Sequence, residues 1–235
     1  MADQFSSTAG TMAATDSNNQ EHFVSHFSVT EALSEPFYLE LTLVSKNFSA
    51  QSQLGQSLTV HRYSTSDGSL NLQQTFNGIV TKVTHQGLDA NLQYTSYKVE
   101  LRPWFWLLKH THNFRVYQNQ STKEIIGDIF DNSGVSTSYS ANNLPTTKRE
   151  YCLQFNESDY DFVCRLLAEE GVHFYFEHTD GDHQMMLHDA QKPFNQADIN
   201  KFDMVETPSG KYPVIEKWQP ESEFHGASVE LTNYD

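Results

Sequence analysis

Residues 149–178 read REYCLQFNESDYDFVCRLLAEEGVHFYFEH, and this stretch contains the strongest structural signals in the chain. Its middle part predicts a helix that begins after Ser158, because Ser158 and Asp161 have the Ser-x-x-Asp spacing of a helix start. Apolar side chains then recur at helical spacing, and Gly171 is a typical helix stop. The apolar face of this helix comprises Phe162, Val163, Leu166 and Leu167.

The residues after this helix predict a β-hairpin. They read VHFYFEHTDGDHQMMLHD (172–189), with Asp180-Gly181 between two alternating runs, which is a strong hairpin signal. A two-residue loop fixes the register, so that Phe176 faces Met185. One face of the hairpin, which we expect to be buried, then carries Phe174, Phe176, Met185 and Leu187.

A second helix is predicted in STKEIIGDIFDNSG (121–134), where Ser121 and Glu124 have capping-box spacing and Gly134 ends the pattern. Short alternating runs elsewhere predict strands at 23–33, 36–45, 57–63, 75–85 and 94–108. Within the last of these, Pro103 lacks a ladder donor and is expected at an edge, bend or bulge. The sequence is therefore mainly β, with two or three short capped helices inserted.

Length and charge exclude several classes of protein. The 235 residues carry 30 acidic against 15 basic side chains, a formal net charge of −15. Such a chain lacks the clustered cations that nucleic-acid binding needs, and anionic lipid headgroups repel it. No run of about 18 apolar residues exists, so we expect no integral membrane protein. The N-terminus also lacks the basic and apolar regions of a signal peptide.

Two cysteines, Cys152 and Cys164, do not make a disulfide framework, and we interpret them as free thiols. Four histidines at five-residue spacing are the first candidates for a metal site: His173, His178, His183 and His188. The hairpin register places them as two facing pairs, 173 with 188 and 178 with 183, on opposite faces. Because zinc normally takes three or four protein ligands, we predict no metal site and leave a two-ligand or interface site as the alternative.

Other constellations are also weak as catalytic sites. The acidic cluster Glu157, Asp159 and Asp161 is explained by a helix start, where negative charge is favourable. No nucleophile-elbow, cysteine-protease or phosphate-loop motif occurs. The aromatic run Trp104, Phe105 and Trp106 favours a core or interface role over a ligand platform. We therefore predict no catalytic, cofactor-binding or metal-binding residues and no enzymatic activity.

Three motifs in order carry a family resemblance. Residues 149–178 closely resemble the signature of VgrG proteins, the spike-hub components of type VI secretion systems, which are related to contractile-phage tail hubs. FNGIVTKV (76–83) is similar to the family's strand with a central glycine. LRPWFWLLKHTHNFRVYQNQSTKEII (101–126) is similar to its Pro-aromatic strand, Arg-aromatic-Gln turn and capped helix. The terminal ASVELTNYD (227–235) is similar to a strand that precedes a further barrel segment.

The resemblance implies β-barrel hub domains that trimerise at the head of a tube of Hcp rings. It further implies a PAAR tip protein and effectors as partners through parts absent from this chain, which resembles the N-terminal hub portion. The implied location is the bacterial cytoplasm during assembly, followed by secretion through the type VI apparatus. We expect a flexible tail at 1–20, a first barrel domain at 21–110, a connecting segment with two helices at 111–171, and strands of an incomplete second β domain at 172–235.

The leading hypothesis is thus a structural spike-hub subunit without a cofactor. Two alternatives come from other classes: an aromatic-lined carbohydrate-binding β module that uses Trp104, Trp106 and Trp218, and a hydrolase with an unrecognised nucleophile. The resemblance implies that a trimeric β-helical needle follows the hub and stabilises the trimer. Without that needle, we expect this chain alone to be monomeric or weakly trimeric, because each copy adds a charge of −15.

Overall fold

A computed structural model describes part of the chain in two compact units, Met1–Lys192 and Pro193–Asp235. The described residues are 12–66, 69–88, 94–141, 144–189, 203–204, 214–215, 217–220 and 222. In the second unit, β12 (Asp203–Met204) pairs in parallel with β13 (Val214–Ile215). The strand predicted in 227–235 lies outside the described residues.

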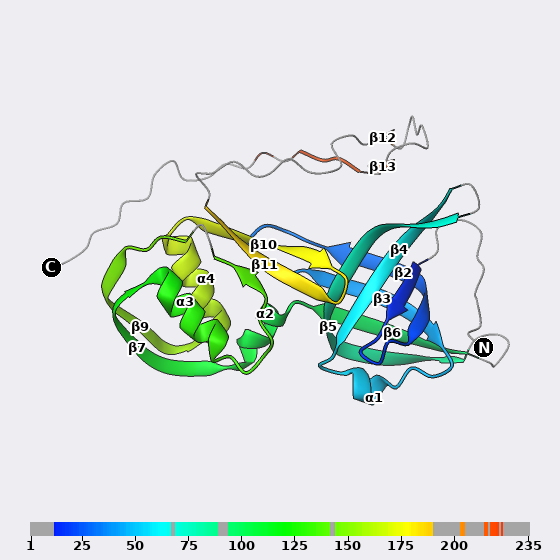
Figure 1. Cartoon of the computed structure of the whole chain (residues 1–235), viewed down its shortest axis with the longest axis horizontal. Coiled ribbons are helices and arrows are strands. Elements are labelled where there is room, and N and C mark those ends of the chain that lie inside the picture. The colour runs from blue at the N-terminus through cyan, green and yellow to red at the C-terminus, as the bar shows by residue number, and fades with distance from the viewer. Residues whose placement is uncertain are drawn as a thin grey trace. The chain divides into compact units, whose positions relative to one another are not determined.

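Six antiparallel strands of the first unit close into a barrel (Figure 1). They are β1 (Met12–Thr15), β2 (Glu21–Thr30), β3 (Tyr38–Ser45), β4 (Ser57–Ser66), β5 (Ser69–Leu88) and β6 (Thr95–Arg102), in the order β1-β2-β3-β6-β5-β4. A short helix, α1 (Ala50–Gln53), connects β3 to β4. The alternation read in 36–45 has its expected consequence, because Leu39, Leu41 and Leu43 of β3 are fully buried in the barrel.

The flexible tail expected at 1–20 is wrong for residues 12–20. β1 pairs with both β2 and β4 and so closes the barrel, and Ala13 and Ala14 are buried. Asp16 holds the turn that follows, because its Oδ1 atom accepts hydrogen bonds from the backbone N–H groups of Asn18 and Gln20. Small side chains fit here beside larger neighbours, so the low aromatic content of this segment did not mean disorder. Residues 1–11 lie outside the described residues.

The single strand predicted at 94–108 is also wrong, since β6 ends at Arg102. Pro103 has φ −68° and ψ 156° and caps α2 (Trp104–Leu107), which continues as the 3-10 turn η1 (Leu108–His110). The bend expected at this proline is therefore confirmed. Because the chain turns here, Trp104 and Phe105 both point into the core instead of alternating between two faces.

Beyond this bend, a two-stranded sheet curves around two helices (Figure 1). The strands are β7 (His112–Ser121) and β9 (Lys148–Ser158), and the helices are α3 (Thr122–Asp131) and α4 (Asp159–Glu169). The predicted capping box is present in full between Ser121 and Glu124. The Ser158 side chain accepts from the backbone N–H of Asp161, as the sequence predicted.

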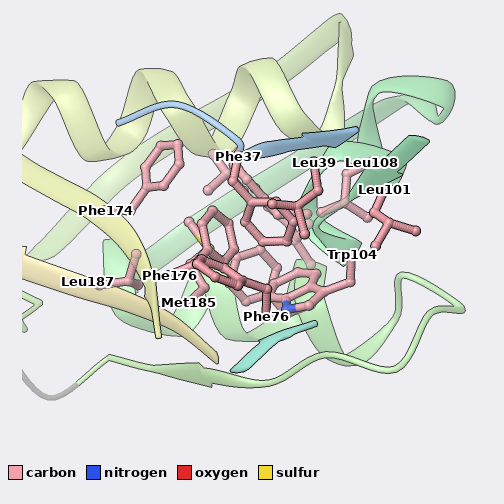
Figure 2. Close-up of a cluster of buried hydrophobic side chains, with 14 of the residues drawn as sticks. Phe37, Leu39, Phe76, Leu101, Trp104, Leu108, Phe174, Phe176, Met185 and Leu187 are labelled. Carbon is pink, nitrogen blue, oxygen red and sulfur yellow. The ribbon is translucent and has the colours of Figure 1, made fainter. Parts of the chain in front are cut away.

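The predicted hairpin is confirmed in its register. β10 (Val172–Thr179) and β11 (Asp182–Asp189) pair so that Phe176 faces Met185, and β8 (Tyr139–Ser140) adds a third strand beside β11. All four side chains expected on the inner face are at most 9% exposed. Figure 2 shows them in one cluster with barrel and α2 side chains, where the rings of Phe37 and Phe176 meet edge to face at 5.1 Å.

The hairpin thus shares a hydrophobic core with the barrel and the helices. The boundary between the two compact units lies between Lys192 and Pro193. The sequence instead suggested that a second β domain begins at residue 172. The assignment of 111–171 to a connecting segment and of 172–235 to a second β domain stays a prediction.

Candidate functional site: a histidine junction and an apolar sheet face

Two of the four spaced histidines join the hairpin to the barrel. His178 and His183 face each other across the hairpin, on the same inward side as Phe176. The ring of His183 is buried, with the residue only 2% exposed. Its Nε2 atom accepts a hydrogen bond at 2.9 Å from the backbone N–H of Trp104, at the start of α2. The other ring nitrogen, Nδ1, therefore carries the proton of the neutral ring.

That proton is directed at Asn77 of β5, because His183 Nδ1 lies 2.8 Å from Asn77 Oδ1. The Asn77 amide nitrogen donates in turn to the hydroxyls of Ser57 and Thr59 on β4, each at 2.8 Å. His178 lies against the backbone of Asn77 at 3.1 Å. One barrel asparagine thus receives both hairpin histidines, so we interpret the junction as a packed and fully hydrogen-bonded structural contact.

Burial and, to a smaller extent, the nearby His178 together lower the pKa of His183 to about 4. The cause is desolvation, which penalises the charged imidazolium more than the neutral ring. A neutral His183 matches its contacts, since an imidazolium would direct a second N–H at the Trp104 N–H donor. The junction is therefore built for the uncharged ring at neutral pH.

The other two histidines lie on the opposite face, where His173 faces His188 as the register predicted. His173 contacts Ser34 of the loop after β2 through Nδ1, at 3.3 Å. No group of three or more His, Cys, Asp or Glu side chains suited to a metal gathers among the described residues. The prediction that no divalent metal is required still needs an experiment.

Asp159, which the sequence suggested as a helix-start residue, has a further role. It is only 1% exposed, and its carboxylate lies 2.6 Å from the Arg115 guanidinium of β7. Asn113, Thr111 and Gln154 also donate to it. These hydrogen bonds hold the pKa of the Asp159 carboxyl below its usual value even though burial alone would raise it. This network joins the start of α4 to both strands of the curved sheet.

The other members of that acidic cluster are separate from Asp159. Glu157 pairs with Arg165, which also pairs with Glu169 one turn later in α4. The Asp161 carboxylate accepts from the Ser158 hydroxyl at 2.6 Å. The three acids thus each take a different structural contact.

A buried Asp-His-Ser series at one end of the barrel escaped the sequence reasoning. Asp16 Oδ2 lies 3.1 Å from His22 Nε2, and His22 Nδ1 lies 2.9 Å from Ser45 Oγ. The order of groups is that of a hydrolytic triad, but the serine hydroxyl is buried and accepts from the Asn47 backbone N–H. Gln53 of α1 donates to the same Asp16 oxygen. The series therefore fastens β1 and α1 to the barrel.

Trp104, one of the three tryptophans named for a carbohydrate site, is a core residue of the first unit. Trp104 is 2% exposed, and its indole N–H donates to the carbonyl of Ser138 at 3.2 Å. Trp106 packs against His110. Trp218 is 72% exposed and belongs to the second unit. Because Trp104 is buried beside Phe105 and Phe130, its ring is closed to a sugar.

Both cysteines are free thiols, as expected. Burial raises the pKa of the Cys152 thiol, and it raises that of Cys164 to about 11. Neither thiol is therefore activated as a nucleophile. The described part of the chain also contains no helix that is both long and apolar enough to cross a membrane.

A shallow cavity of about 590 Å³ lies between β5 and the turn of the hairpin. The apolar part of the cavity lining consists of Leu72, Phe76 and Phe176. Its acidic groups are already paired, because Glu31 contacts His178 and Asp180 contacts His61. The cavity thus offers a mixed surface without a cluster of catalytic groups.

Among the described residues, five of the eleven exposed large hydrophobic side chains lie on the outer face of the β7–β9 sheet. Cross-strand pairs there are Phe114 with Phe155, Val116 with Leu153, and Gln118 with Tyr151, and these six side chains form what we call the outer ribbon face. Its five apolar members are 38–69% exposed. The two phenylalanine rings meet edge to face at 5.2 Å. None of the six side chains carries a charge, which distinguishes this face from the rest of an acidic chain.

This mainly β fold, with a closed barrel followed by a helix-filled sheet and a hairpin, is of the phage tail-hub class. The chain belongs to the phage tail baseplate hub (GPD) family, whose model matches residues 30–235. The resemblance noted in the sequence is therefore confirmed.

Curated relatives carry the spike-protein name. The chain is 34% identical to the type VI secretion system spike protein VgrG1b of Pseudomonas aeruginosa, over 87% of this chain and 28% of that protein. It is 32% identical to VgrG1a of the same organism, over 87% of this chain and 32% of that protein. The actin cross-linking toxin VgrG1 of Vibrio cholerae is 33% identical over 66% of this chain but 14% of its own length. The chain thus spans about a third or less of these relatives.

Solved structures support the fold at lower identity. An E. coli component of the type VI secretion system, described as similar to the T4 tail proteins gp27 and gp5, aligns with a TM-score of 0.54 at 20% identity, over 83% of this chain and 48% of that one. A 43 kDa tail protein of prophage MuSo2 from Shewanella oneidensis aligns with a TM-score of 0.53 at 15% identity. This alignment covers 91% of this chain and 74% of that one. Both likenesses concern the fold alone.

Proposed function

We propose that this chain is the hub module of a type VI secretion spike, a structural subunit that trimerises and joins the Hcp tube to the puncturing spike. The observation that carries the proposal is the 34% identity to VgrG1b over 87% of this chain. Because the match covers 28% of that relative, the role proposed is that of the hub portion.

The proposed role is non-enzymatic. It is supported by the way the candidate chemical groups are used: His183 and Asp159 each make hydrogen bonds that join elements of the fold. The toxin name of the Vibrio cholerae relative does not argue against it, because the match covers 14% of that protein.

The proposed partners are a second and third copy of this chain, Hcp rings, and, through other parts of a full-length spike, a PAAR tip protein and effectors. A solved Francisella VgrG is named as a complex with PdpA, which illustrates that a relative binds another protein. Assembly in the bacterial cytoplasm and secretion by the type VI apparatus follow from the same proposal.

Co-sedimentation tests the tube contact directly. Purified chain is mixed with Hcp rings from the same genome, at moderate salt so that charge repulsion is screened. We expect the chain to sediment with the rings at a fixed stoichiometry, and rings from an unrelated system serve as the control. Equal sedimentation with both kinds of ring, or with neither, would reject the proposed tube contact.

A further inference from the structure

We propose that the cavity between β5 and the hairpin turn is a peptide-binding groove, in which a short extended segment of a partner polypeptide adds as a β-strand. Two strand segments line this strand groove, 72–76 of β5 and 176 with 178–180 at the end of β10, together with Glu31. The segment that fits it alternates apolar side chains with neutral or basic ones. This inference goes beyond the proposed function, because it requires neither a trimer nor a tube.

β5 brings one unpaired edge to the strand groove. It pairs with β4 along residues 69–79, but its pairing with β6 begins only at Ile79. The backbone N–H of Asn77 points away from β4, since its nitrogen lies 3.1 Å from His178 Nδ1. Backbone groups alternate in direction along an antiparallel strand, so those of Thr75 point the same way. Residues 72–76 are thus paired with a neighbouring strand on one side only.

β10 brings the second unpaired edge (Figure 1). It is the edge strand of its sheet, whose order is β10-β11-β8. The carbonyl of Phe174 points away from β11, because it accepts a hydrogen bond from the Ser34 backbone N–H at 2.8 Å. By the same alternation, the N–H and C=O of Phe176 point away from β11. Among the described residues, no backbone hydrogen bond outside the strand ladders reaches Thr75 or Phe176.

Two unpaired strand edges beside one cavity favour recognition through the main chain. The open N–H and C=O groups of an edge strand form a template for pairing with another chain. When an extended peptide adds to such an edge, the backbone groups supply affinity, and adjoining pockets select alternate side chains. The volume of about 590 Å³ lies within the usual range of ligand sites, so the occupant is a short segment.

The lining side chains define the chemistry of that segment. Leu72, Phe76 and Phe176 supply apolar contacts, and no lysine or arginine occurs among the described lining residues. The charged groups are the carboxylates of Glu31 and Asp180, which neighbouring histidines hold in place. Side chains of a strand alternate between two sides, so an apolar residue contacts the phenylalanine rings while its neighbours carry positive charge toward the carboxylates. An acidic segment is repelled.

Fluorescence anisotropy with a labelled peptide tests the strand groove. The probe is the heptapeptide Lys-Val-Thr-Val-Lys-Val-Thr with both ends blocked, titrated with the 235-residue chain at moderate salt. Two further forms carry methyl groups on alternate backbone nitrogens, one on the odd positions and one on the even positions. Each keeps the charge and side chains of the probe but lacks the donors of one strand edge. A fourth form has Glu in place of Lys.

We expect saturable binding of the probe below about 1 mM. At least one methylated form should bind about tenfold more weakly or worse, because it loses main-chain hydrogen bonds, and so should the Glu form. Equal binding of the probe and both methylated forms would reduce the effect to charge attraction and overturn strand addition. The absence of saturable binding would also overturn it.

Leu72→Lys and Leu88→Lys locate the binding site. Both leucines lie on β5 and are 53% and 58% exposed, but of the two Leu72 alone lines the strand groove. A lysine at position 72 removes an apolar contact and repels the basic probe, so binding should weaken about tenfold or more, whereas Leu88→Lys should bind like the wild type. Equal binding by the two variants would overturn the location.

Circular dichroism checks that both variants fold. Thr75→Pro removes an N–H that points away from β4, and it is the second groove variant if Leu72→Lys does not fold. Sedimentation without peptide tests a different occupant: self-association lost in Leu72→Lys but kept in Leu88→Lys would place a second copy in the strand groove and overturn the inference. Failure of the Hcp contact would reject the proposed function without affecting these peptide measurements.

Discussion

His183 Nδ1 lies 2.8 Å from Asn77 Oδ1, and this hydrogen bond joins residues that are 106 positions apart in the sequence. It connects the hairpin to β5 of the barrel, and the His183 ring also contacts the rings of Phe37 and Phe176. Because His183 also accepts from the Trp104 backbone, three separate elements meet on one neutral ring. The junction should therefore be sensitive to protonation.

The stability of the chain should fall between pH 6.5 and pH 4 because of His183. Its pKa in the folded state is lowered from 6.5 to about 4, so within this window the unfolded chain binds a proton that the folded chain does not. The free energy of unfolding then decreases by about 1.4 kcal/mol per pH unit from this group as pH falls. Above pH 6.5 the contribution is constant.

Urea unfolding at several pH values between 7 and 4.5 measures this dependence. His183→Gln lacks the titrating ring. As pH falls, its free energy of unfolding should therefore decrease less steeply than that of the wild type, by a slope difference equivalent to close to one bound proton. Carboxylates such as Asp159 contribute equally to both proteins and cancel in the comparison. Identical pH slopes for the two proteins would show that His183 is not the coupled group.

Arg115→Met should destabilise the fold by about 3 kcal/mol, because it leaves the buried Asp159 carboxylate without its cationic partner. Arg165→Met is the matched control. The Arg165 side chain is 40% exposed and its guanidinium pairs at the surface, so the expected loss is below about 1 kcal/mol. Chemical denaturation measures both values, and equal losses would contradict the importance assigned to burial.

Gly78→Ala should also destabilise the barrel, by about 1–3 kcal/mol. A Cβ atom at Gly78 would lie 3.0 Å from Leu101 Cβ and 3.2 Å from a Phe37 ring carbon, so β6 or the shared core must shift. Gly127→Ala in α3 is the control, since its nearest neighbour would be the Tyr139 hydroxyl at 3.7 Å. Helix propensity predicts that Gly127→Ala is neutral or stabilising. Thermal melts of both variants measure the two effects, and equal losses of stability would contradict the close packing assigned to Gly78.

Removing divalent metal should leave the thermal midpoint unchanged. The two histidine pairs of the hairpin lie on opposite faces, and His183 already uses both ring nitrogens in hydrogen bonds. Calorimetry with and without a chelator measures the effect. A fall of about 5 °C or more, which corresponds to roughly 1–2 kcal/mol in a domain of this size, would mean that a structural metal was missed.

Local signals account for what the sequence predicted well. The Ser121 capping box and the Asp180-Gly181 turn each involve residues close together in the chain, so their patterns determine helix start and hairpin register directly. The buried face of the hairpin then follows from alternation alone.

Contacts between distant residues account for what was missed. β1 is stabilised by pairing with β2 and β4 and by Gln53, 37 residues after Asp16, and no pattern within 1–20 shows those partners. The role of His183 depends likewise on Asn77 in the barrel. The bend at Pro103 was predicted, but α2 was not, because aromatic residues are common in strands and the turn is fixed by tertiary packing.

Sedimentation of the wild-type chain at micromolar concentration, in low and in moderate salt, tests the central claim of a self-assembling hub module most directly. Three copies gather a formal charge of −45, so apolar contact must exceed both this repulsion and the entropy cost of association. We predict a concentration-dependent equilibrium between monomer and trimer that higher salt shifts toward trimer. A salt-insensitive trimer that persists at nanomolar concentration, or association that weakens as salt screens the charge, would contradict the account.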